Sequence, residues 1–186
     1  FFLVAIGGPL AYWYFSIPPT CSDGIQNQRE SAIDRGGPCL LLDERILQPQ
    51  ATLWTRSFRV RDGSYNAAAY VYNPNTDAGV REVHYRFGLY DAENLLVAER
   101  EGTTFIVPGA VTPILESRID TGNRIVSHTY FEFISTFTWE RMTNTALALT
   151  VSNKEISNVE SEPRLSANVK NQSVVDITNP LFVAVI

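Results

Sequence analysis

The sequence predicts an all-β sandwich that follows an N-terminal transmembrane helix. The first 17 residues, FFLVAIGGPLAYWYFSI, carry no charge, and the first charged side chain of the 186-residue chain is Asp23. From Gln50 onward, short runs of β-branched and aromatic residues alternate with Asn, Asp, Gly and Pro turn signals. This alternation is typical of a β-sandwich, and no stretch keeps an amphipathic helical period for more than about ten residues.

Residues 1–17 have the composition of a membrane-spanning helix. A hydrocarbon core of about 30 Å needs roughly 20 helical residues, and this segment reaches about 26 Å at the helical rise. Gly7 and Gly8 would let another helix approach closely. Four aromatic residues close the segment: Tyr12, Trp13, Tyr14 and Phe15. Such rings favour the headgroup zone, so we expect a single-pass anchor in the lipid bilayer, with the remainder displayed outside the cytoplasm.

Other interpretations of this segment stay open. A signal peptide should show a small-x-small cleavage site before Thr20, which is missing. A buried core helix fits poorly with four consecutive aromatic residues. Processed pilin-like subunits begin with Phe and an apolar helix followed by a β-rich head. Phe1 matches that pattern, whereas Ala5 stands where many such subunits carry Glu. A pilin-like filament subunit is therefore the alternative to a membrane-anchored display protein.

The charge of the chain argues against nucleic acid as a partner. The formal net charge is −5 and the pI is near 5.0, whereas a phosphate-binding surface needs clustered Lys and Arg. The basic residues Arg56, Arg59 and Arg61 lie in a strand-like stretch, where a solvated strand face is the simpler explanation. We expect the partners to be the bilayer and other membrane or envelope proteins, or copies of this chain.

Cys21 and Cys39 are the two cysteines, and the residues between them are rich in Asp, Asn, Gly and Ser. Beside a membrane, in an oxidising compartment, we expect such a pair to form a disulfide. Closing this loop would restrict the unfolded chain by about 3 kcal/mol in the entropy model. A zinc site is disfavoured because two thiols without a neighbouring His do not supply four ligands.

The cysteine segment resembles a short element of bacterial surface proteins with the pattern C-x-D-G-x-x-N-x-x-E-x-x-x-D-C-G-G-x-C. The matching residues are Cys21, Asp23, Gly24, Asn27, Glu30, Asp34, Gly36, Gly37 and Cys39. Arg35 and Leu42 stand where the pattern often has further cysteines. The resemblance implies that one disulfide has been dropped, which leaves Cys21 with Cys39.

Four oxygen-bearing residues of this segment are calcium-ligand candidates: Asp23, Asn27, Glu30 and Asp34. They are spaced three or four apart, and calcium takes six to eight oxygen ligands. They could supply part of a shell. The competing explanation is that they are turn formers and caps, because the alternation of an EF-hand loop is missing.

The run Phe87-Gly88-Leu89-Tyr90-Asp91 reads F-x-L-Y-D and ends the clearest predicted strand, Val80–Tyr90. Within that strand one face is apolar: Val83, Tyr85, Phe87 and Leu89. The motif resembles the FxLYD-type immunoglobulin-like domain of bacterial envelope and secreted proteins. The resemblance covers roughly Leu53 to Met142, and it implies that Leu89 lies in the core and that Asp91 caps a hairpin turn. Separate strands are expected next at 95–98 and 103–107.

A repeat indicates a second module. The residues Ala69–Asn73 align with 167–171, and Leu89 aligns with Ile186 when one gap is allowed. We therefore expect a helix at 1–17, a disulfide-stapled linker at 18–49, an immunoglobulin-like sandwich at 50–142 and the start of a second, truncated sandwich at 143–186. A tandem of modules is typical of a stalk or display architecture.

No residue cluster points to a reaction. His84 and His128 lie in predicted strands, where a surface position is expected. The chain contains no nucleophile elbow, phosphate loop, zinc-protease motif or dinucleotide fingerprint. We expect a non-catalytic display or assembly protein of a bacterial cell envelope, in the periplasm or at the cell surface. An enzyme whose catalytic part lies outside these residues is the remaining alternative.

Overall fold

A computed structural model describes residues 6–12, 21–143, 149–160, 163–177 and 182–184. The chain divides into two compact units, residues 1–144 and 145–186. Residues 6–12 are helical and exposed, and the rest of the expected anchor lies outside the described residues. Within the described ranges, no helix combines the length and the apolar character needed to cross a bilayer.

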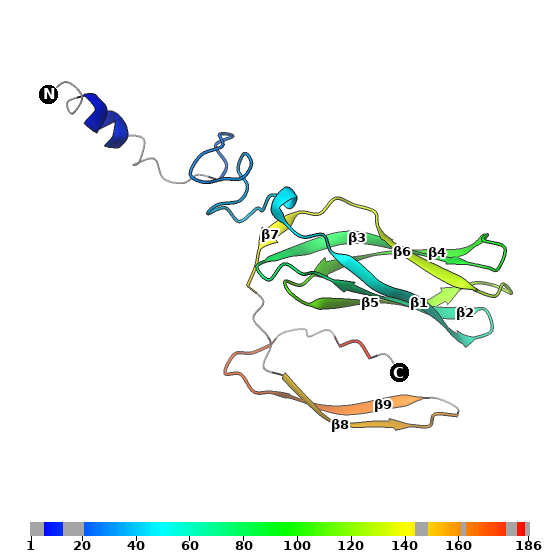
Figure 1. The fold of residues 1–186 in the computed structure, drawn as a ribbon. Coiled ribbons are helices and arrows are strands. Elements are labelled where there is room, and N and C mark those ends of the chain that lie inside the picture. The colour runs from blue at the N-terminus through cyan, green and yellow to red at the C-terminus, as the bar shows by residue number, and fades with distance from the viewer. Residues whose placement is uncertain (1–5, 13–20, 144–148, 161–162, 178–181, 185–186) are drawn as a thin grey trace. The chain divides into compact units, whose positions relative to one another are not determined.

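The first unit is a two-layered β-sandwich (Figure 1). Its elements are η1 (Glu44–Ile46), β1 (Ala51–Arg61), β2 (Ser64–Tyr72), β3 (Ala78–Tyr90), β4 (Leu96–Ile106), β5 (Val111–Asp120), β6 (His128–Phe133) and β7 (Trp139–Arg141). Sheet I has the order β1-β2-β5. Sheet II has the order β4-β3-β6, and β7 pairs with the beginning of β3. All these pairs are antiparallel, and the expected all-β class is confirmed.

The strand β3 forms the centre of sheet II and supplies much of the core. Its inward residues are the predicted ones, Val83, Tyr85, Phe87 and Leu89, and each is at most 5% exposed. Tyr85, Phe87 and Leu89 pack with the inward residues of β2, which are Tyr65, Ala67, Ala69 and Val71, whereas Val83 belongs to a second core cluster. Because side chains alternate along a strand, one period-two run fills one layer of the core. Burying each large apolar side chain contributes about 1.5–3 kcal/mol.

The strand β4 is longer than predicted. The sequence predicts separate strands at 95–98 and 103–107, whereas β4 is continuous and pairs with β3 along most of its length. The charged run between the two predicted strands is accommodated because most of it is exposed. Gly102 is required there: a Cβ at this position would lie 2.4 Å from the Tyr85 hydroxyl.

The cysteine segment docks on the sandwich. The Leu42 amide donates to the Trp139 carbonyl (2.8 Å), and the Arg141 amide donates to the Leu40 carbonyl (2.7 Å), which adds a short extended edge beside β7. Leu42 is 4% exposed and packs in the second core cluster with Trp139. The Arg141 guanidinium also donates to the Gly37 carbonyl at 2.8 Å. The segment expected to be a linker is thus in contact with the sandwich it precedes.

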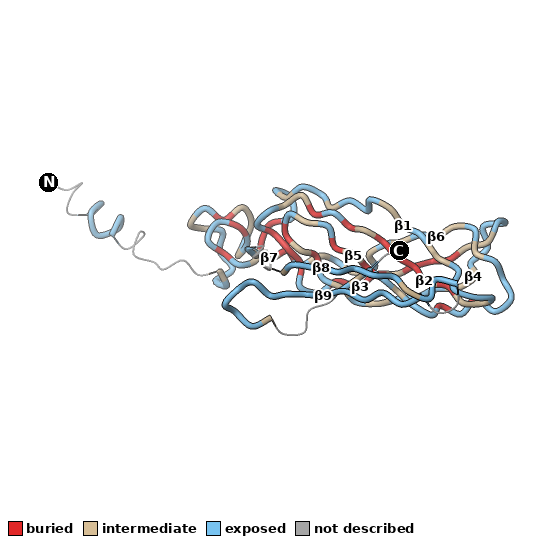
Figure 2. Tube along the Cα trace, turned by 90° about the horizontal axis from the view of Figure 1, so that it is seen from below, coloured by how far each residue is buried: buried red, intermediate tan, exposed pale blue. Residues whose placement is uncertain are grey.

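The second unit contains a β-hairpin, β8 (Leu149–Ser157) with β9 (Arg164–Asn171). Both strands are largely exposed, in contrast to the largely buried strands β2 and β3 of the first unit (Figure 2). Three apolar side chains, Val151, Leu165 and Val169, are 41–46% exposed. A lone hairpin buries little apolar surface and is marginal in water. Among the described residues of the second unit, therefore, no second β-layer covers the apolar side chains of this hairpin.

Candidate functional site

The cysteine loop is closed by the disulfide that the sequence predicts. Cys21 and Cys39 are bonded, with their Cα atoms 5.5 Å apart. Glu30 Oε1 lies 3.2 Å from the buried Cys39 Sγ. These three side chains bring candidate ligand atoms within 4.8 Å of one another. Both sulfurs are consumed by the disulfide, so this trio cannot bind a metal through thiolates.

The four calcium candidates lie close together and cap the backbone of the loop. The Asp34 carboxylate accepts hydrogen bonds from the amides of Asp23 and Gly24, each at 3.1 Å. Glu30 Oε2 accepts from the amides of Asn27 (3.2 Å) and Asp34 (3.3 Å). Asn27 Nδ2 donates to Asp23 Oδ2 at 3.0 Å. These hydrogen bonds are the ones expected of turn formers and caps, which is the explanation that competes with calcium binding.

One oxygen in the same cluster has no partner. Asn27 Oδ1 is buried and accepts no hydrogen bond within the described part of the chain. Leaving such an acceptor unsatisfied costs about 1–3 kcal/mol, and an amide oxygen is also a calcium ligand type. Calcium binding by Asp23, Asn27, Glu30 and Asp34 stays a prediction.

The F-x-L-Y-D motif forms the end of β3 and the turn that follows. Phe87 and Leu89 are completely buried. Asp91 Oδ1 accepts a hydrogen bond from the Leu95 amide at 2.9 Å, so Asp91 caps the β3–β4 hairpin as the resemblance implies. That hydrogen bond lowers the pKa of Asp91, and the ion pair with Arg124 lowers it further.

Tyr90 belongs to an aromatic cluster on the outer side of sheet II. Its ring lies over Gly88, where a Cβ would be 2.8 Å from Tyr90 Cε2. The ring stacks on His128 (centroids 5.5 Å, planes 5° apart), and Tyr130 stands edge-on to both at 5.4 Å. The sequence did not predict this cluster, because it depends on the register that sets Tyr90 opposite His128 and Gly88 opposite Tyr130.

The rest of that outer surface is acidic. Arg86 reaches three carboxylates: Glu132 at 2.6 Å, Glu99 at 3.5 Å and Glu101 at 3.9 Å. The hydrogen bond to Glu132 is the main cause that raises the pKa of Arg86. One guanidinium thus faces three carboxylates. We call this surface the acidic face, comprising Arg86, Tyr90, Glu99, Glu101, His128, Tyr130 and Glu132.

The outer surface of sheet I has the opposite character. The strand register places eleven residues on it: Ala51, Trp54, Arg56, Phe58, Asn66, Ala68, Tyr70, Tyr72, Val111, Pro113 and Leu115. The rings of Trp54 and Tyr70 are 4.5 Å apart, and the Arg56 guanidinium lies 5.8 Å from the centre of the Trp54 ring. Arg56 is the one charged member of this set, which we call the apolar face.

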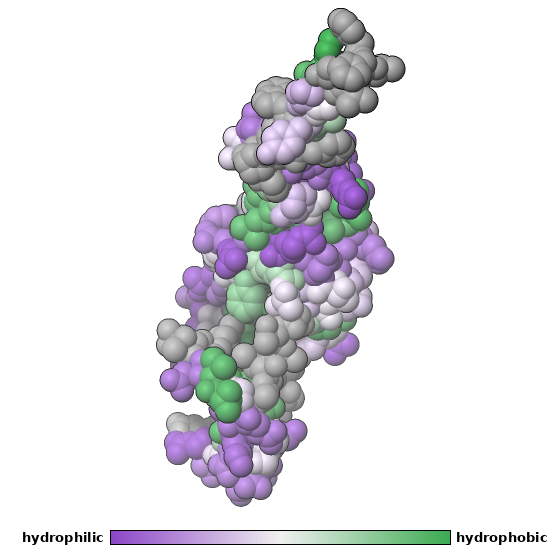
Figure 3. Space-filling model, turned by 90° about the vertical axis from the view of Figure 1, so that its left-hand side faces the viewer, coloured by the Kyte–Doolittle hydropathy of each residue, from purple (hydrophilic) through white to green (hydrophobic). Residues whose placement is uncertain are grey.

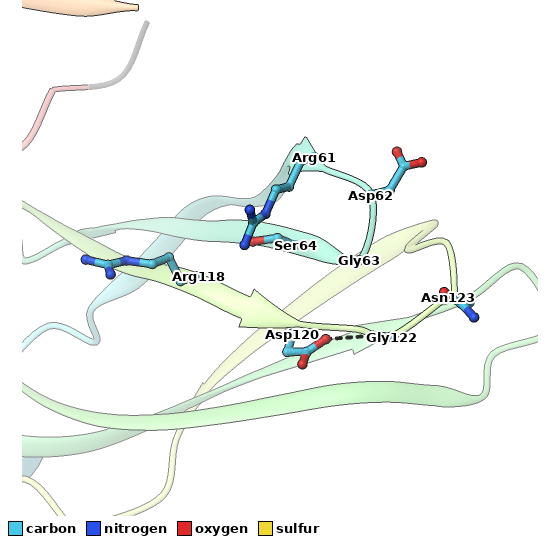
Figure 4. Close-up of a pocket in the computed structure, with 8 residues that line it drawn as sticks. All are labelled: Arg61, Asp62, Gly63, Ser64, Arg118, Asp120, Gly122 and Asn123. Atoms are coloured by element: carbon cyan, nitrogen blue, oxygen red, sulfur yellow. Dashed lines mark hydrogen bonds between the residues drawn. The ribbon is translucent and has the colours of Figure 1, made fainter. Parts of the chain in front are cut away.

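An open pocket of about 440 Å³ lies at the end of sheet I. Its lining is drawn in Figure 4: Arg61, Asp62, Gly63, Ser64, Arg118, Asp120, Gly122 and Asn123. Asp62 is paired with Arg59, and Asp120 accepts a hydrogen bond from the Gly122 amide at 2.8 Å. Arg61, Arg118 and Asp120 form no ion pair with any described residue, so the pocket end of sheet I carries two unpaired arginines and one unpaired carboxylate.

A buried asparagine organises the turn after β2. Asn73 is completely buried. Its Nδ2 donates to the carbonyls of Ala78 (2.7 Å) and Val107 (3.1 Å). Its Oδ1 accepts from the Asn75 amide at 3.0 Å and from Asn75 Nδ2 at 2.9 Å. Asn75 in turn exchanges two hydrogen bonds with the backbone of Gln48, so this turn also fixes the entry to β1.

Part of this hydrogen-bond pattern returns at Asn171, the last residue of β9. Asn171 Oδ1 accepts from the Ser173 amide at 2.9 Å, and Asn171 Nδ2 donates to the Val175 carbonyl at 2.8 Å. The two asparagines therefore share the hydrogen bond from the amide two residues on, although Asn73 is buried and Asn171 is exposed.

The residues expected at the membrane are described only in part. Gly7 and Gly8 lie in the short helix, and an added Cβ at either would meet no atom within 4 Å. Tyr12 is 77% exposed. Trp13, Tyr14 and Phe15 lie outside the described residues. These roles stay predictions.

The histidines face outward, as predicted for a surface position on a strand. His84 Nδ1 lies 3.2 Å from Thr103 Oγ1, and His128 joins the aromatic cluster. Neither belongs to a group of three metal-ligating side chains among the described residues. No protein-family model, curated protein or solved structure matches this chain.

Proposed function

We propose that this chain is a non-catalytic display or assembly protein of a bacterial cell envelope. Residues 1–17 anchor it in the membrane, and the β-modules stand outside the cytoplasm. The Cys21–Cys39 disulfide carries this proposal, because it lies directly after the uncharged segment. Such bonds persist in the periplasm and at cell surfaces and are rare in the cytosol.

We assign the sandwich to the immunoglobulin-like type. The support is the strand order, with β1, β2 and β5 in one sheet and β3, β4, β6 and β7 in the other. This division resembles that of immunoglobulin-like sandwiches, in which the central strand of the second sheet pairs with its sequence neighbour. The repeat of the Asn73 turn at Asn171 supports a tandem of two such modules. A tandem would hold a binding surface away from the membrane.

The anchor is tested by placing a charge in it. An arginine near the middle of a membrane helix costs about 2.5–3.5 kcal/mol. With Leu10→Arg we expect the full-length protein to move from the carbonate-resistant membrane pellet to the supernatant. Gln172→Arg adds the same charge in an exposed segment of the second unit and should stay in the pellet. Release of the parent protein by carbonate would overturn the anchor.

A pilin-like filament subunit is the alternative, and Phe1 is the observation that favours it. In that case residues 1–17 would pack between many copies rather than in lipid. Shearing intact cells separates the two. Filaments containing this chain in the sheared supernatant would favour the pilin-like subunit, whereas a chain that stays with the cells would favour the anchored protein.

A further inference from the structure

The two outer surfaces of the sandwich are complementary, and we propose that copies of this chain associate front to back through them. The apolar face of one copy binds the acidic face of the next. The partner is thus another copy of the same chain, and this proposal rests on the proposed function only for where in the cell the copies meet.

The apolar face has the composition of a contact surface. The outer side of an antiparallel sheet that faces water normally carries polar residues. Here Tyr72, Val111 and Leu115 are 39–41% exposed beside the Trp54 and Tyr70 rings. Scattered hydrophobic residues, as on the view in Figure 3, are normal on a protein surface, whereas neighbouring ones on three paired strands mark an interaction site. Trp, Tyr and Arg are also the residue types that dominate interface energetics.

The strands of sheet I carry four arginines and two carboxylates. Arg56 stands over the Trp54 ring, and Arg61 and Arg118 lie at the pocket end, where Figure 4 shows their side chains. None of these three forms an ion pair with a described residue. Arg59 is neutralised by Asp62. Arginines therefore outnumber carboxylates on sheet I, although the formal net charge of the chain is −5.

The acidic face supplies the complement. Three carboxylates surround the single guanidinium of Arg86, and Tyr130, at 63% exposure, offers its ring beside them. Aromatic rings on one face can pack against rings on the other. Carboxylates can pair with the exposed guanidinium of Arg56. Complementary potentials of this kind favour encounter and exclude wrong partners.

The direction of association follows from the charges. If two apolar faces came together, the Arg56 side chains of the two copies would lie on the same interface. If two acidic faces came together, six carboxylates would meet with only two Arg86 side chains. Like charges facing each other are unfavourable. The two faces belong to opposite layers of one sandwich (Figure 1). Contact between unlike faces is therefore heterologous, and it continues into rows of copies unless a rotation closes a ring.

Two blocked variants of the full chain test this inference by sedimentation velocity in excess detergent micelles. Arg56→Glu blocks the apolar face, and Glu99→Lys with Glu101→Lys blocks the acidic face. We expect the parent to form species larger than a dimer at low salt and to dissociate as salt screens the charges. Each blocked variant alone should associate at least about tenfold more weakly.

A mixture of the two blocked variants should associate again, because each retains the face that the other lacks and because the two charge reversals are complementary to each other. Glu93→Lys, in the exposed β3–β4 turn, is the matched control and should associate like the parent. Leu115→Glu gives a second block of the apolar face if Arg56→Glu misfolds by circular dichroism.

A parent that stays monomeric, blocked variants that associate like the parent, or a mixture that does not associate would overturn the inference. Loss of association with carbonate-resistant anchoring intact would leave the proposed function standing.

Discussion

Replacing Asn73 by Ala should remove the hydrogen bonds that fix the turn between the two sheets. The side chain is fully buried and donates to the carbonyls of Ala78, which begins β3, and Val107, which follows β4. It also accepts from the Asn75 amide. Alanine replaces none of these contacts, and the close packing around the site leaves little room for water to do so.

The cost follows from the number of groups left without a partner. Each buried polar group that loses its hydrogen bond costs about 1–3 kcal/mol. The two carbonyls of Ala78 and Val107 therefore predict a loss of about 2–6 kcal/mol in the free energy of unfolding. Asn73→Asp should be at least as costly at neutral pH, because a carboxylate would face both carbonyls.

Urea unfolding followed by tryptophan fluorescence measures this loss, since Trp54 and Trp139 lie in the sandwich. An unchanged slope with urea shows that the difference is one of stability. Asn75→Ala is the matched control, and we expect it to cost under about 1 kcal/mol because its partners are near solvent. Equal losses for Asn73→Ala and Asn75→Ala would refute the reasoning.

Three further predictions concern the cysteine segment. Replacing Cys21 and Cys39 by Ser should lower the free energy of unfolding by about 3 kcal/mol in the loop-entropy model, and thiol titration of the parent should find free thiols only after reduction. The hydrogen bond from Arg45 lowers the pKa of Asp43 to about 2. The ionised Asp43 therefore contributes its full share to the free energy of unfolding above the ordinary carboxyl pKa, and this share is lost as pH falls from about 4 to 2. Asp43→Asn should flatten the dependence of the free energy of unfolding on pH in that range. Asp34→Ala should lower the melting temperature even in EDTA, because two amides lose their acceptor, and a parent whose melting temperature does not respond to calcium would end the calcium prediction.

The strands of the sandwich could be predicted where local pattern and tertiary burial agree. The strand β3 alternates apolar and polar residues, and its inward set is the predicted one. The strand β4 was divided wrongly, because a charged run with a glycine reads as a break. The space needed by the Tyr85 hydroxyl explains Gly102, and that need arises from a neighbouring strand. A single sequence does not contain this contact.

The candidate sites divide in the same way. The disulfide was predictable because the chain has two cysteines. The capping role of Asp91 could be predicted because its hydrogen-bond partners, the amides of Glu93 and Leu95, follow within four residues in the sequence. The acidic and apolar faces were not predicted, since each combines residues from three strands whose register is set by the fold. The roles of residues 1–17 remain sequence predictions.

The disulfide also acts beyond the loop that it closes. Exposed strand edges invite pairing with other chains, and proteins cover them with neighbouring segments. Leu40 and Leu42 cover β7 in this way, and Arg141 holds the segment through its amide and its guanidinium. The bond at Cys39 lies immediately before this edge, so closing the loop restricts the segment that must stay in place. Reduction should therefore expose Trp139, which packs with Leu42, before it unfolds the sandwich.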